Sequence, residues 1–400
     1  MAERNPWLTI VGIGEDGPAG LSAASHDAIA RADWVTGAAR HLALLPDLPA
    51  AATPWPVPFA DGIAPLLARR GSHVVMLVSG DPFWFGAGSV VTRHLSPDEW
   101  VAHPAPSTFT LAAARLGWVI EGTVCLGLHA APFERLRRHL APSVRAIVLV
   151  RDGAAVAALA RYLVDCGFAE SALWVLEALG GPRERIRETD AASCDFADIL
   201  HPVAVALEVS GGGPALTTAS GLADDWFAHD GQITKRPVRA LTLSALAPRP
   251  GELLWDIGAG SGSVAIEWLL AHPATQALAF EADPTRTERA RDNAAALGVD
   301  RLRVVEGRVP AVLEGQPLPN AVFIGGGLSD ALLEWLGTTL PRGTRLVANA
   351  VTLESEAVLA RWHNDRGGNL LRIELADAAP IGTRRGWRSH YPIVQWSVTL

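Results

Sequence analysis

The sequence predicts an α/β protein made of two domains, and three observations support this prediction. Apolar segments of strand length alternate with segments of helical pattern, which is typical of α/β folds. The chain has 400 residues, more than one hydrophobic core usually accommodates. Glycine and proline interrupt both patterns at Gly211-Gly212-Gly213-Pro214. We therefore expect a first domain over residues 1–213, a linker over 214–224 and a second domain over 225–400.

The first half of the chain contains strands separated by helices. An apolar strand from Trp7 to Ile13 precedes a glycine turn and a helical pattern that ends near Ala32. Further predicted elements are strands at His73–Ser79, Ala146–Val150, Ala172–Leu176 and Val203–Val209, and a helix at Gly86–Leu95. Because helices separate the strands, we expect parallel strand–helix–strand units.

The second half repeats this alternation. Predicted helices are Lys235–Leu246, Gly262–Leu270, Pro284–Leu297 and Asp330–Leu340, and predicted strands are Leu253–Ile257, Ala277–Glu281, Leu302–Glu306, Ala321–Ile324 and Arg345–Ala348. The end of the chain differs, because no helix separates the predicted strands Leu370–Ala376 and Ile393–Val398. We expect these two strands to form a closing antiparallel hairpin.

Composition and charge exclude several classes of protein. The net charge of -8 argues against a nucleic-acid partner, which would require a basic surface. No apolar run is long enough for a membrane span, and the first residues lack the apolar stretch of a signal peptide. We therefore expect a cytoplasmic protein without a membrane partner. The three cysteines form no motif typical of a metal site, so no metal is expected.

A glycine-rich loop follows a predicted strand in the second half and opens a helix. The segment Trp255 to Gly262 contains the pattern GxGxG, and Glu281 ends the next strand about 20 residues later. A dinucleotide-binding loop would have GxGxxG, but Ser263 occupies the place of the third glycine. The arrangement resembles the class I methyltransferases. A dehydrogenase and a purely structural turn are the alternatives.

Two segments, Thr234 to Leu241 and Trp255 to Glu267, extend this resemblance to the decarboxylating precorrin-6B C-15 methyltransferases, over residues 227–400. The resemblance implies that Thr234 borders the methyl donor and that Glu281 binds its ribose. It also implies that the methionine part lies on Gly258, Ala259, Gly260, Ser261 and Gly262. The family often has Gly-Asp-Ala-Pro near the adenine, whereas this chain has Gly307-Arg308-Val309-Pro310. A backbone contact at Val309 is therefore expected in place of a side-chain contact.

Three motifs in the first half resemble the tetrapyrrole methylases, and in particular the precorrin C-5 methyltransferases, over about residues 6–211. They lie at Val78–Gly86, Pro106–Thr108 and Leu179–Ile186, and a weaker glycine pattern starts at Ile10. The resemblance implies a two-lobed α/β fold that binds the donor in the cleft between the lobes. It implies donor contacts at Gly80, Asp81, Ser107 and Thr108. Asp81 has an equally good alternative role as the cap of the following helix.

Taken together, the two halves resemble the fused precorrin-6B (precorrin-6Y) C-5,C-15-methyltransferases (decarboxylating) of cobalamin biosynthesis. The resemblance implies two S-adenosyl-L-methionine sites, a corrin precursor as substrate and a homo-oligomer. Methylation at carbons 5 and 15 with loss of the ring C acetate carboxyl would give precorrin-8. The alternatives are the same chemistry on a cobalt-precorrin, a nicotinamide-dependent tetrapyrrole oxidoreductase and a non-catalytic corrinoid carrier. No catalytic residue is identified.

Five residues are candidates for binding the substrate. Gly326 belongs to a glycine run that leaves space for a flat ring, although a tight turn explains the run equally well. Arg384, Arg385 and Arg388 form a basic segment that suits the carboxylates of a polyanion. A solvated surface loop is the alternative for these arginines. Lys235 is the only lysine in a chain whose other basic residues are arginines, which suggests a specific role.

Overall fold

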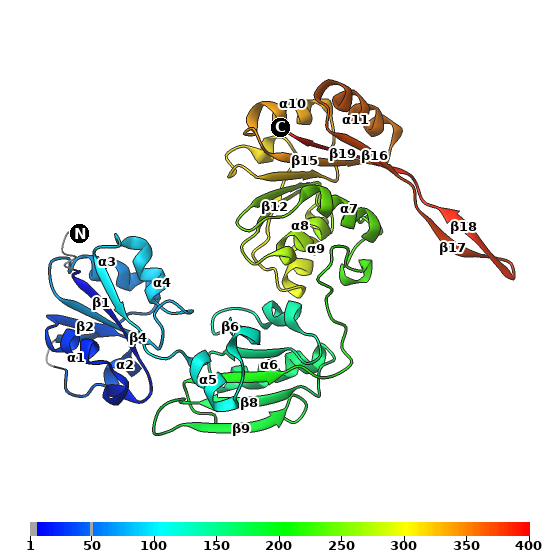
Figure 1. Ribbon diagram of the computed structural model, residues 1–400. Helices are drawn as coiled ribbons and strands as arrows, with labels where there is room; N and C mark the ends of the chain where they lie inside the picture. Colours follow the sequence, from blue (N-terminus) through cyan, green and yellow to red (C-terminus); the bar gives the residue numbers. More distant parts are fainter. Residues whose placement is uncertain (1–5, 49–50) are drawn as a thin grey trace. The chain divides into compact units, whose positions relative to one another are not determined.

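The computed structural model describes residues 6–48 and 51–400, so the N-terminal residues considered above, up to Asn5, lie outside it. The chain divides into two compact units (Figure 1). Unit 1 comprises Met1–Ala131 and His139–Pro214, and unit 2 comprises Pro132–Arg138 and Ala215–Leu400. Among the described residues, no helix has the length and apolar character needed to cross a membrane.

The first sheet of unit 1 is parallel throughout, with strand order β3-β2-β4-β1-β5. Its strands are β1 (Leu8–Ile13), β2 (Trp34–Gly37), β3 (Ala51–Pro54), β4 (Val74–Ser79) and β5 (Trp100–His103). Its helices are α1 (Ala23–Ala30), α2 (Ala39–Ala43), α3 (Ile63–Leu67) and α4 (Gly88–Val91). Val74 to Val78 of β4 are all buried, as expected for a central strand covered on both faces.

The second sheet of unit 1 is mixed, with strand order β6-β7-β10-β8-β9. Its strands are β6 (Val124–Gly127), β7 (Arg145–Leu149), β8 (Ala172–Glu177), β9 (Arg185–Asp190) and β10 (Val203–Glu208), and its helices are α5 (Thr108–Leu116) and α6 (Gly153–Asp165). Only β6 and β7 pair in parallel, whereas β10 runs antiparallel to β7 and β8. The expectation of parallel units was wrong here, because β8, β9 and β10 follow one another without an intervening helix.

Unit 2 contains a seven-stranded sheet with strand order β13-β12-β11-β14-β15-β19-β16. Its strands are β11 (Leu253–Ile257), β12 (Gln276–Glu281), β13 (Arg303–Glu306), β14 (Ala321–Ile324), β15 (Arg345–Ala350), β16 (Asn369–Ile373) and β19 (Ile393–Thr399). Its helices are α7 (Arg236–Leu246), α8 (Ser263–Ala271), α9 (Pro284–Ala296), α10 (Asp330–Thr339) and α11 (Leu353–Arg366). The strands from β13 to β15 are parallel, and Trp255, Trp268 and Trp396 are fully buried in the core.

Short 3-10 turns complete the two units. They are η1 (Gly17–Gly20), η2 (Phe59–Gly62), η3 (Thr92–His94), η4 (Ile120–Gly122), η5 (Phe133–His139), η6 (Asp224–Trp226) and η7 (Ala311–Leu313). The α/β class predicted from the sequence is confirmed in both units.

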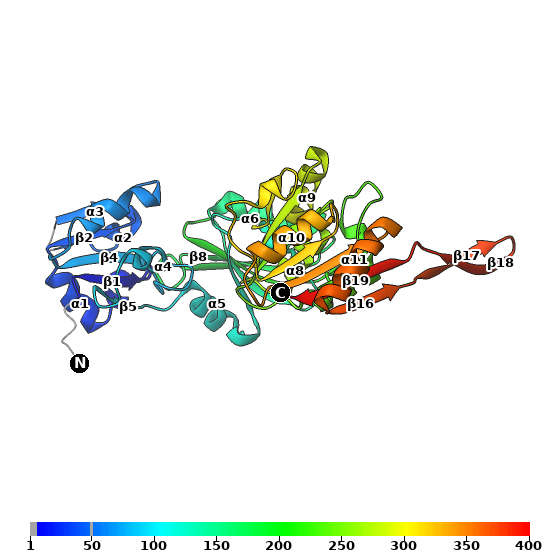
Figure 2. The same cartoon turned by 90° about the horizontal axis from the view of Figure 1, so that it is seen from above.

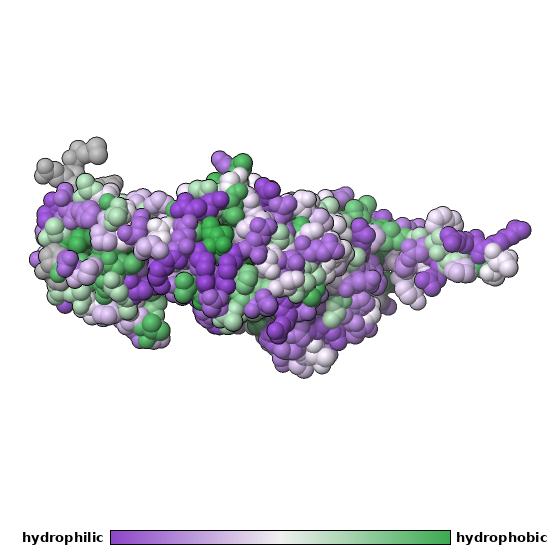
Figure 3. Space-filling model, turned by 90° about the horizontal axis from the view of Figure 1, so that it is seen from below, coloured by the Kyte–Doolittle hydropathy of each residue, from purple (hydrophilic) through white to green (hydrophobic). Residues whose placement is uncertain are grey.

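The expected antiparallel closure of unit 2 is present, since β16 pairs with β19 and β19 pairs with β15. A second strand pair, β17 (Ala376–Ile381) and β18 (Arg384–Ser389), lies between β16 and β19 and was not expected. These strands form a two-stranded ribbon that extends away from the sheet (Figures 1 and 2). Hydrophilic residues cover much of this ribbon on the face seen in Figure 3.

The pairing register shows at which edge the ribbon leaves the sheet. Ala350, the last residue of β15, pairs with Val394, and Ile373, the last residue of β16, pairs with Ile393. The ribbon therefore starts at the edge where the parallel strands have their carboxyl ends. In open α/β sheets this is the edge at which ligands bind.

Candidate functional site

The glycine loop of unit 2 connects β11 to α8 at the carboxyl edge of the sheet. The φ angles of Gly258, Gly260 and Gly262 are +69°, +57° and +75°. Residues with a Cβ rarely adopt this backbone conformation. A Cβ on Gly258 would lie only 2.6 Å from the backbone of Gly326. The predicted donor loop and the predicted substrate residue Gly326 are therefore in backbone contact.

Glu281 ends β12 and lies against this loop. Its Oε2 accepts a hydrogen bond from the Gly260 amide at 2.8 Å, and its Oε1 accepts from the amides of Ala282 and Asp283 at 2.8 and 3.0 Å. These three amides fix the orientation of the carboxylate beside the loop. The sequence pattern placed Glu281 at the end of the strand that follows the glycine loop, and β12 ends at this residue.

Asp256 is a buried acid in β11 that the sequence analysis did not assign to the site. Its Oδ2 accepts from the Ala265 amide at 3.0 Å, and Oδ1 has no hydrogen-bond partner among the described residues. Burial, together with the nearby Glu281, raises the pKa of Asp256 to about 7. The signal in the sequence was its place two residues before Gly258, the first glycine of the loop pattern.

Two more predicted residues lie at the same edge of the sheet. The Cγ2 atom of Val309 lies 3.4 Å from the position that a Cβ on Gly327 would occupy, so its loop borders the glycine run after β14. Thr234 directly precedes Lys235 at the start of α7, and its carbonyl accepts a hydrogen bond from Arg239. The carbonyl of Gln232 lies 3.9 Å from a Cβ position on Gly260, which places this segment beside the loop.

The charged substrate candidates do not contact the glycine loop. The side chain of Lys235 is 47% exposed, and its Nζ lies 3.7 Å from Asp224. Arg384, Arg385 and Arg388 are exposed on β18 of the ribbon, where Arg388 pairs across from Asp377. The arginines thus belong to a strand, whereas the sequence analysis considered a surface loop as one possibility.

A second candidate site lies in unit 1, where a cavity of about 600 Å³ separates the two sheets. Gly80, Asp81, Ser107 and Thr108 all line this cavity, so the structure brings the four residues predicted in unit 1 together. Gly80 has a φ angle of +51°, and a Cβ there would lie 2.9 Å from the Pro106 carbonyl. The loop after β4 and the start of α5 are therefore packed closely against each other.

The roles of two of these residues in the fold are specific. Ser107 is the N-cap of α5, because its hydroxyl accepts from the Thr110 amide at 3.1 Å. Asp81 accepts from the Phe83 amide at 2.8 Å and so stabilises a turn. The alternative of a helix cap was wrong for Asp81, because α4 begins only at Gly88 and has no side-chain cap.

Polar side chains line another part of the same cavity. Glu15 pairs with Arg40 at 3.0 Å, and Arg40 also donates to the hydroxyl of Ser79. The Nε2 atom of His41 lies 3.1 Å from the Ser79 oxygen. Burial and the adjacent Arg40 lower the pKa of His41 to about 3, so its imidazole is neutral at physiological pH. Sequence reasoning did not single out these four residues.

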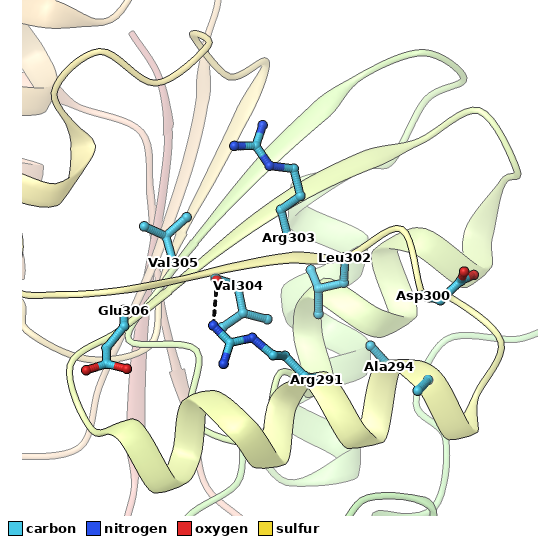
Figure 4. Close-up of a pocket in the computed structure, with 9 residues that line it drawn as sticks. Arg291, Ala294, Asp300, Leu302, Arg303, Val304, Val305 and Glu306 are labelled. Carbon is cyan, nitrogen blue, oxygen red and sulfur yellow. Dashed lines mark hydrogen bonds between the residues drawn. The ribbon is translucent and has the colours of Figure 1, made fainter. Parts of the chain in front are cut away.

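A groove of about 640 Å³ runs beside the edge strand β13 of unit 2 (Figure 4). Leu302 and Val304 face α9, whereas Arg303 and Val305 point to the other side of the strand. Arg291 of α9 donates to the Val304 carbonyl at 3.2 Å and so covers one acceptor of the unpaired edge. None of the predicted site residues lines this groove, so we assign it a structural role.

Comparison with known proteins covers both units. The family model of the tetrapyrrole (corrin/porphyrin) methylases matches residues 7–195, and that of the precorrin methyltransferase domain matches residues 225–400. The precorrin-6Y C(5,15)-methyltransferase [decarboxylating] of Sinorhizobium sp is 49% identical over 400 residues, covering 99% of this chain and 97% of that protein. The chain belongs to the precorrin-6Y C(5,15)-methyltransferase (decarboxylating) family.

Further relatives carry the same description. The precorrin-6Y C(5,15)-methyltransferase [decarboxylating] of Mycobacterium tuberculosis (strain ATCC 25618 / H37Rv) is 42% identical, covering 98% of this chain and 99% of that protein. A solved C-terminal domain of precorrin-6Y C5,15-methyltransferase from Rhodobacter capsulatus is 53% identical, with a TM-score of 0.45. It covers 46% of this chain and 100% of its own.

Membership of this methyltransferase family implies the use of S-adenosyl-L-methionine, and the residues of unit 2 fit such a ligand. The backbone of the glycine loop leaves no room for a Cβ at Gly258, which favours close approach of a ligand. The buried Oδ1 of Asp256 and the buried hydroxyl of Ser261 have no partner among the described residues. Within 6–48 and 51–400, no cluster of three or more His, Cys, Asp or Glu residues is arranged to hold a metal ion.

Proposed function

We propose that this chain methylates precorrin-6B at carbons 5 and 15 and removes the ring C acetate carboxyl as carbon dioxide, giving precorrin-8. One observation carries the proposal. Each unit has its own glycine-containing loop at the end of a strand, surrounded by the residues that the family resemblance implies for a methyl donor. The names of full-length relatives supply the substrate and the two positions.

The two activities are assigned to separate domains, residues 1–213 for carbon 5 and residues 225–400 for carbon 15 and the decarboxylation. In the first domain, the donor would bind in the cavity lined by Gly80, Asp81, Ser107 and Thr108. In the second, it would bind on Gly258 to Gly262, with Glu281 at the ribose and Val309 at the adenine. Two donor sites per chain follow from this assignment.

The residues present suit a reaction that depends on placement. S-Adenosyl-L-methionine, when bound, supplies an electrophilic methyl group. The protein has to hold the nucleophilic ring carbon close to that group and in line with it, which lowers the barrier without covalent help. The fixed glycine loop and the carboxylate of Glu281, held by three amides, provide such a rigid support. We assign no residue as a catalytic acid or base.

The substrate itself supplies the electrons for decarboxylation. Addition of a methyl group places a positive charge on the conjugated ring, and loss of carbon dioxide from the acetate returns an electron pair to it. The macrocycle is thus its own electron sink, and a separate cofactor for this step is unnecessary. A proton must then reach the new methyl group at the former acetate, and the methylated ring carbon must lose its own proton so that the charge balances.

We further assign substrate binding to Gly326, Lys235 and the ribbon arginines Arg384, Arg385 and Arg388. The ribbon supports this assignment because it leaves the sheet at the same edge as the glycine loop. Its arginines are exposed and therefore available to the carboxylates of a polyanion. A cytoplasmic location and a homo-oligomeric state stay predictions of the sequence analysis.

Incubation of the protein with precorrin-6B and a donor labelled in its methyl group tests the proposal. Mass spectrometry of the product should find two labelled methyl groups and the loss of one carbon dioxide. A parallel incubation saturated with S-adenosylhomocysteine serves as the control and should leave the substrate unchanged. A product without label, or a change that requires a nicotinamide in place of the methyl donor, would contradict the proposal.

A further inference from the structure

The segment of residues 221–235, which we call the strap, begins within the last residues of the predicted linker and ends directly before α7. It contains only the short turn η6 and no strand, so most of its backbone groups have no regular ladder of partners. Leu222 and Phe227 of the strap are nevertheless buried in the core of unit 2. Side chains from three helices hold the strap in place.

Arg239 of α7 forms the first attachment. Its side chain is completely buried, with an exposed fraction of 0%. The guanidinium donates to the carbonyls of Leu222 and Thr234, which lie near opposite ends of the strap, and to Asp224 at 3.1 Å. It also lies 4.8 Å from the centre of the Phe227 ring. One buried cation therefore fixes both ends of the segment.

Glu267 of α8 supplies the opposite charge and connects the strap to the glycine loop. It accepts a hydrogen bond from Nε of Arg239 and further bonds from the amides of Gly221 and Leu222 at 2.6 and 2.9 Å. Helix α8 begins at Ser263, directly after the loop. A buried ion pair that loses one partner leaves an uncompensated charge, so neither residue is replaceable without a cost.

Asn293 of α9 forms the third attachment, and it contacts the strap and the glycine loop simultaneously. Its amide nitrogen donates to the carbonyls of Ala228 and Ser261 at 3.0 and 2.9 Å, and its oxygen accepts from the Ala228 amide at 2.8 Å. Ser261 belongs to the glycine loop. A single buried side chain thus sets the spacing between the two segments.

An exposed attachment complements the buried ones. Arg286 of α9 donates to Asp230 at 2.9 Å and to the side chain of Gln232 at 2.8 Å. The carbonyl of Gln232 lies 3.9 Å from a Cβ position on Gly260. The strap therefore runs beside the most open glycine of the loop and limits the space next to it.

We propose that Arg239, Glu267 and Asn293 are positioning residues for carbon-15 methylation, because they hold the strap as one wall of the donor site. The inference rests on the proposed function of the second domain. None of the three residues needs to touch the donor. Their effect would be transmitted through the backbone of residues 228–234, which they keep at a fixed distance from the glycine loop.

Hydrogen exchange of the full chain, titrated with S-adenosylhomocysteine, tests this proposal, because it reports each donor loop separately. Asn293→Ala should speed hydrogen exchange of the strap amides. It should also lower the affinity for S-adenosylhomocysteine, measured by protection of residues 258–262, about tenfold, as expected for the loss of more than one hydrogen bond. Arg286→Ala should lower this affinity by about threefold, because exposed ion pairs contribute less than buried ones. Arg291→Ala, on the same helix but without contact to the strap, is the matched control.

Protection around Gly80 and Ser107 in unit 1 is the internal reference and should be equal in all variants. Faster strap exchange with unchanged affinity at residues 258–262 would overturn the proposal, as would weaker affinity without any change in the strap. If Asn293→Ala fails to fold, Arg286→Ala decides between these outcomes. Wild-type protein without protection at residues 258–262 would contradict the donor site itself, and the role of the strap with it.

Discussion

Gly258 and Gly326 meet through their backbones at the carboxyl edge of the second sheet. A Cβ on Gly258 would lie 2.6 Å from the nitrogen and Cα atoms of Gly326 and 2.9 Å from its carbonyl carbon, too close for any side chain. The sequence indicated the two residues for different reasons, one for the donor and one for the substrate. If the proposed roles are right, their contact would place donor and substrate at adjoining positions, as transfer between them requires.

Gly260 is the glycine of the loop with the most space at its Cβ position. The nearest atom to its Cβ position is the Gln232 carbonyl at 3.9 Å, and its φ angle is +57°. A valine there would project into the proposed donor site and would strain the backbone, because β-branched residues avoid this conformation. We expect Gly260→Val to abolish methylation at carbon 15 and to leave methylation at carbon 5 intact, as measured by mass spectrometry of the products.

The control for this variant is Gly251→Val. Gly251 also has a positive φ angle, +82°, and no atom lies within 4 Å of its Cβ position, but it precedes β11 at the opposite edge. It should show similar strain and retain both methylations. Loss of both activities in folded Gly260→Val would show that the domains do not act separately.

We expect Asp256 to make the stability of the second unit dependent on pH. Its pKa rises from an ordinary 3.8 to about 7 in the folded protein, mainly because it is buried. Between these values the folded state holds a proton that the unfolded state has lost, so the free energy of unfolding falls as the pH rises towards 7. Asp256→Asn removes this ionisation. The free energy of unfolding of Asp256→Asn minus that of the wild type should be about 2–3 kcal/mol more positive at pH 8 than at pH 5.

Denaturant unfolding at the two pH values, followed in the transition of the second unit, measures this difference. Asp292→Asn, on the exposed side of α9, is the matched control. Equal stability differences for Asp256→Asn at pH 5 and pH 8 would mean that the carboxyl is ionised in the folded protein throughout this range.

At the scale of elements, the ribbon of β17 and β18 distributes its arginines over two faces. Side chains alternate along a strand, so Arg384 and Arg388 share one face and Arg385 lies on the other. Asp377 is paired opposite Arg388 and lies 2.7 Å from His390. An extended partner with several carboxylates is therefore required to engage all three arginines.

The ribbon arginines should bind the carboxylates of the macrocycle and leave the methyl donor unaffected. A charged hydrogen bond lost from a partly desolvated contact costs roughly 2–5 kcal/mol. We therefore expect Arg388→Ala to weaken macrocycle binding by about tenfold or more, and Arg388→Lys to recover part of the loss. Added salt should weaken binding to the wild type, because the arginines are exposed.

Titration of the macrocycle, monitored by its absorbance, measures these affinities. Arg342→Ala is the matched control, since Arg342 is also exposed but precedes β15 at the opposite edge of the sheet. Equal binding by wild type and Arg388→Ala would leave the ribbon without a role in substrate binding. A selective loss of donor affinity would assign the arginine to the other ligand.

The sequence predicted most strands but not all of their partners. Strands β8 and β10 were expected from their apolar runs, whereas β9 was missed because Arg185 and Arg187 make it polar. In the structure, both arginines pair with the buried Glu177, so the polar side of β9 faces a buried charge. Since pairing direction depends on long-range contacts, local patterns predicted parallel units where the sheet is antiparallel.

At the scale of the whole molecule, the predicted site residues of each unit come from segments far apart in the chain. The strand order β13-β12-β11-β14 brings Val309, Glu281, the glycine loop and Gly326 to one edge. Motifs identified these residues individually, but their spacing in the sequence did not predict that they lie close together in the fold. Arg239, Glu267 and Asn293 were not expected, because charged and polar residues in amphipathic helices usually face water.

The proposed function requires two independent methyl-donor sites on one chain. Calorimetric titration of the full chain with S-adenosylhomocysteine tests it most directly. We expect a stoichiometry near two for the wild type and near one for Gly260→Val, with the remaining site unchanged in affinity. A wild-type stoichiometry of one would contradict the presence of two sites, if substitutions in one of the two glycine loops also left that binding unchanged.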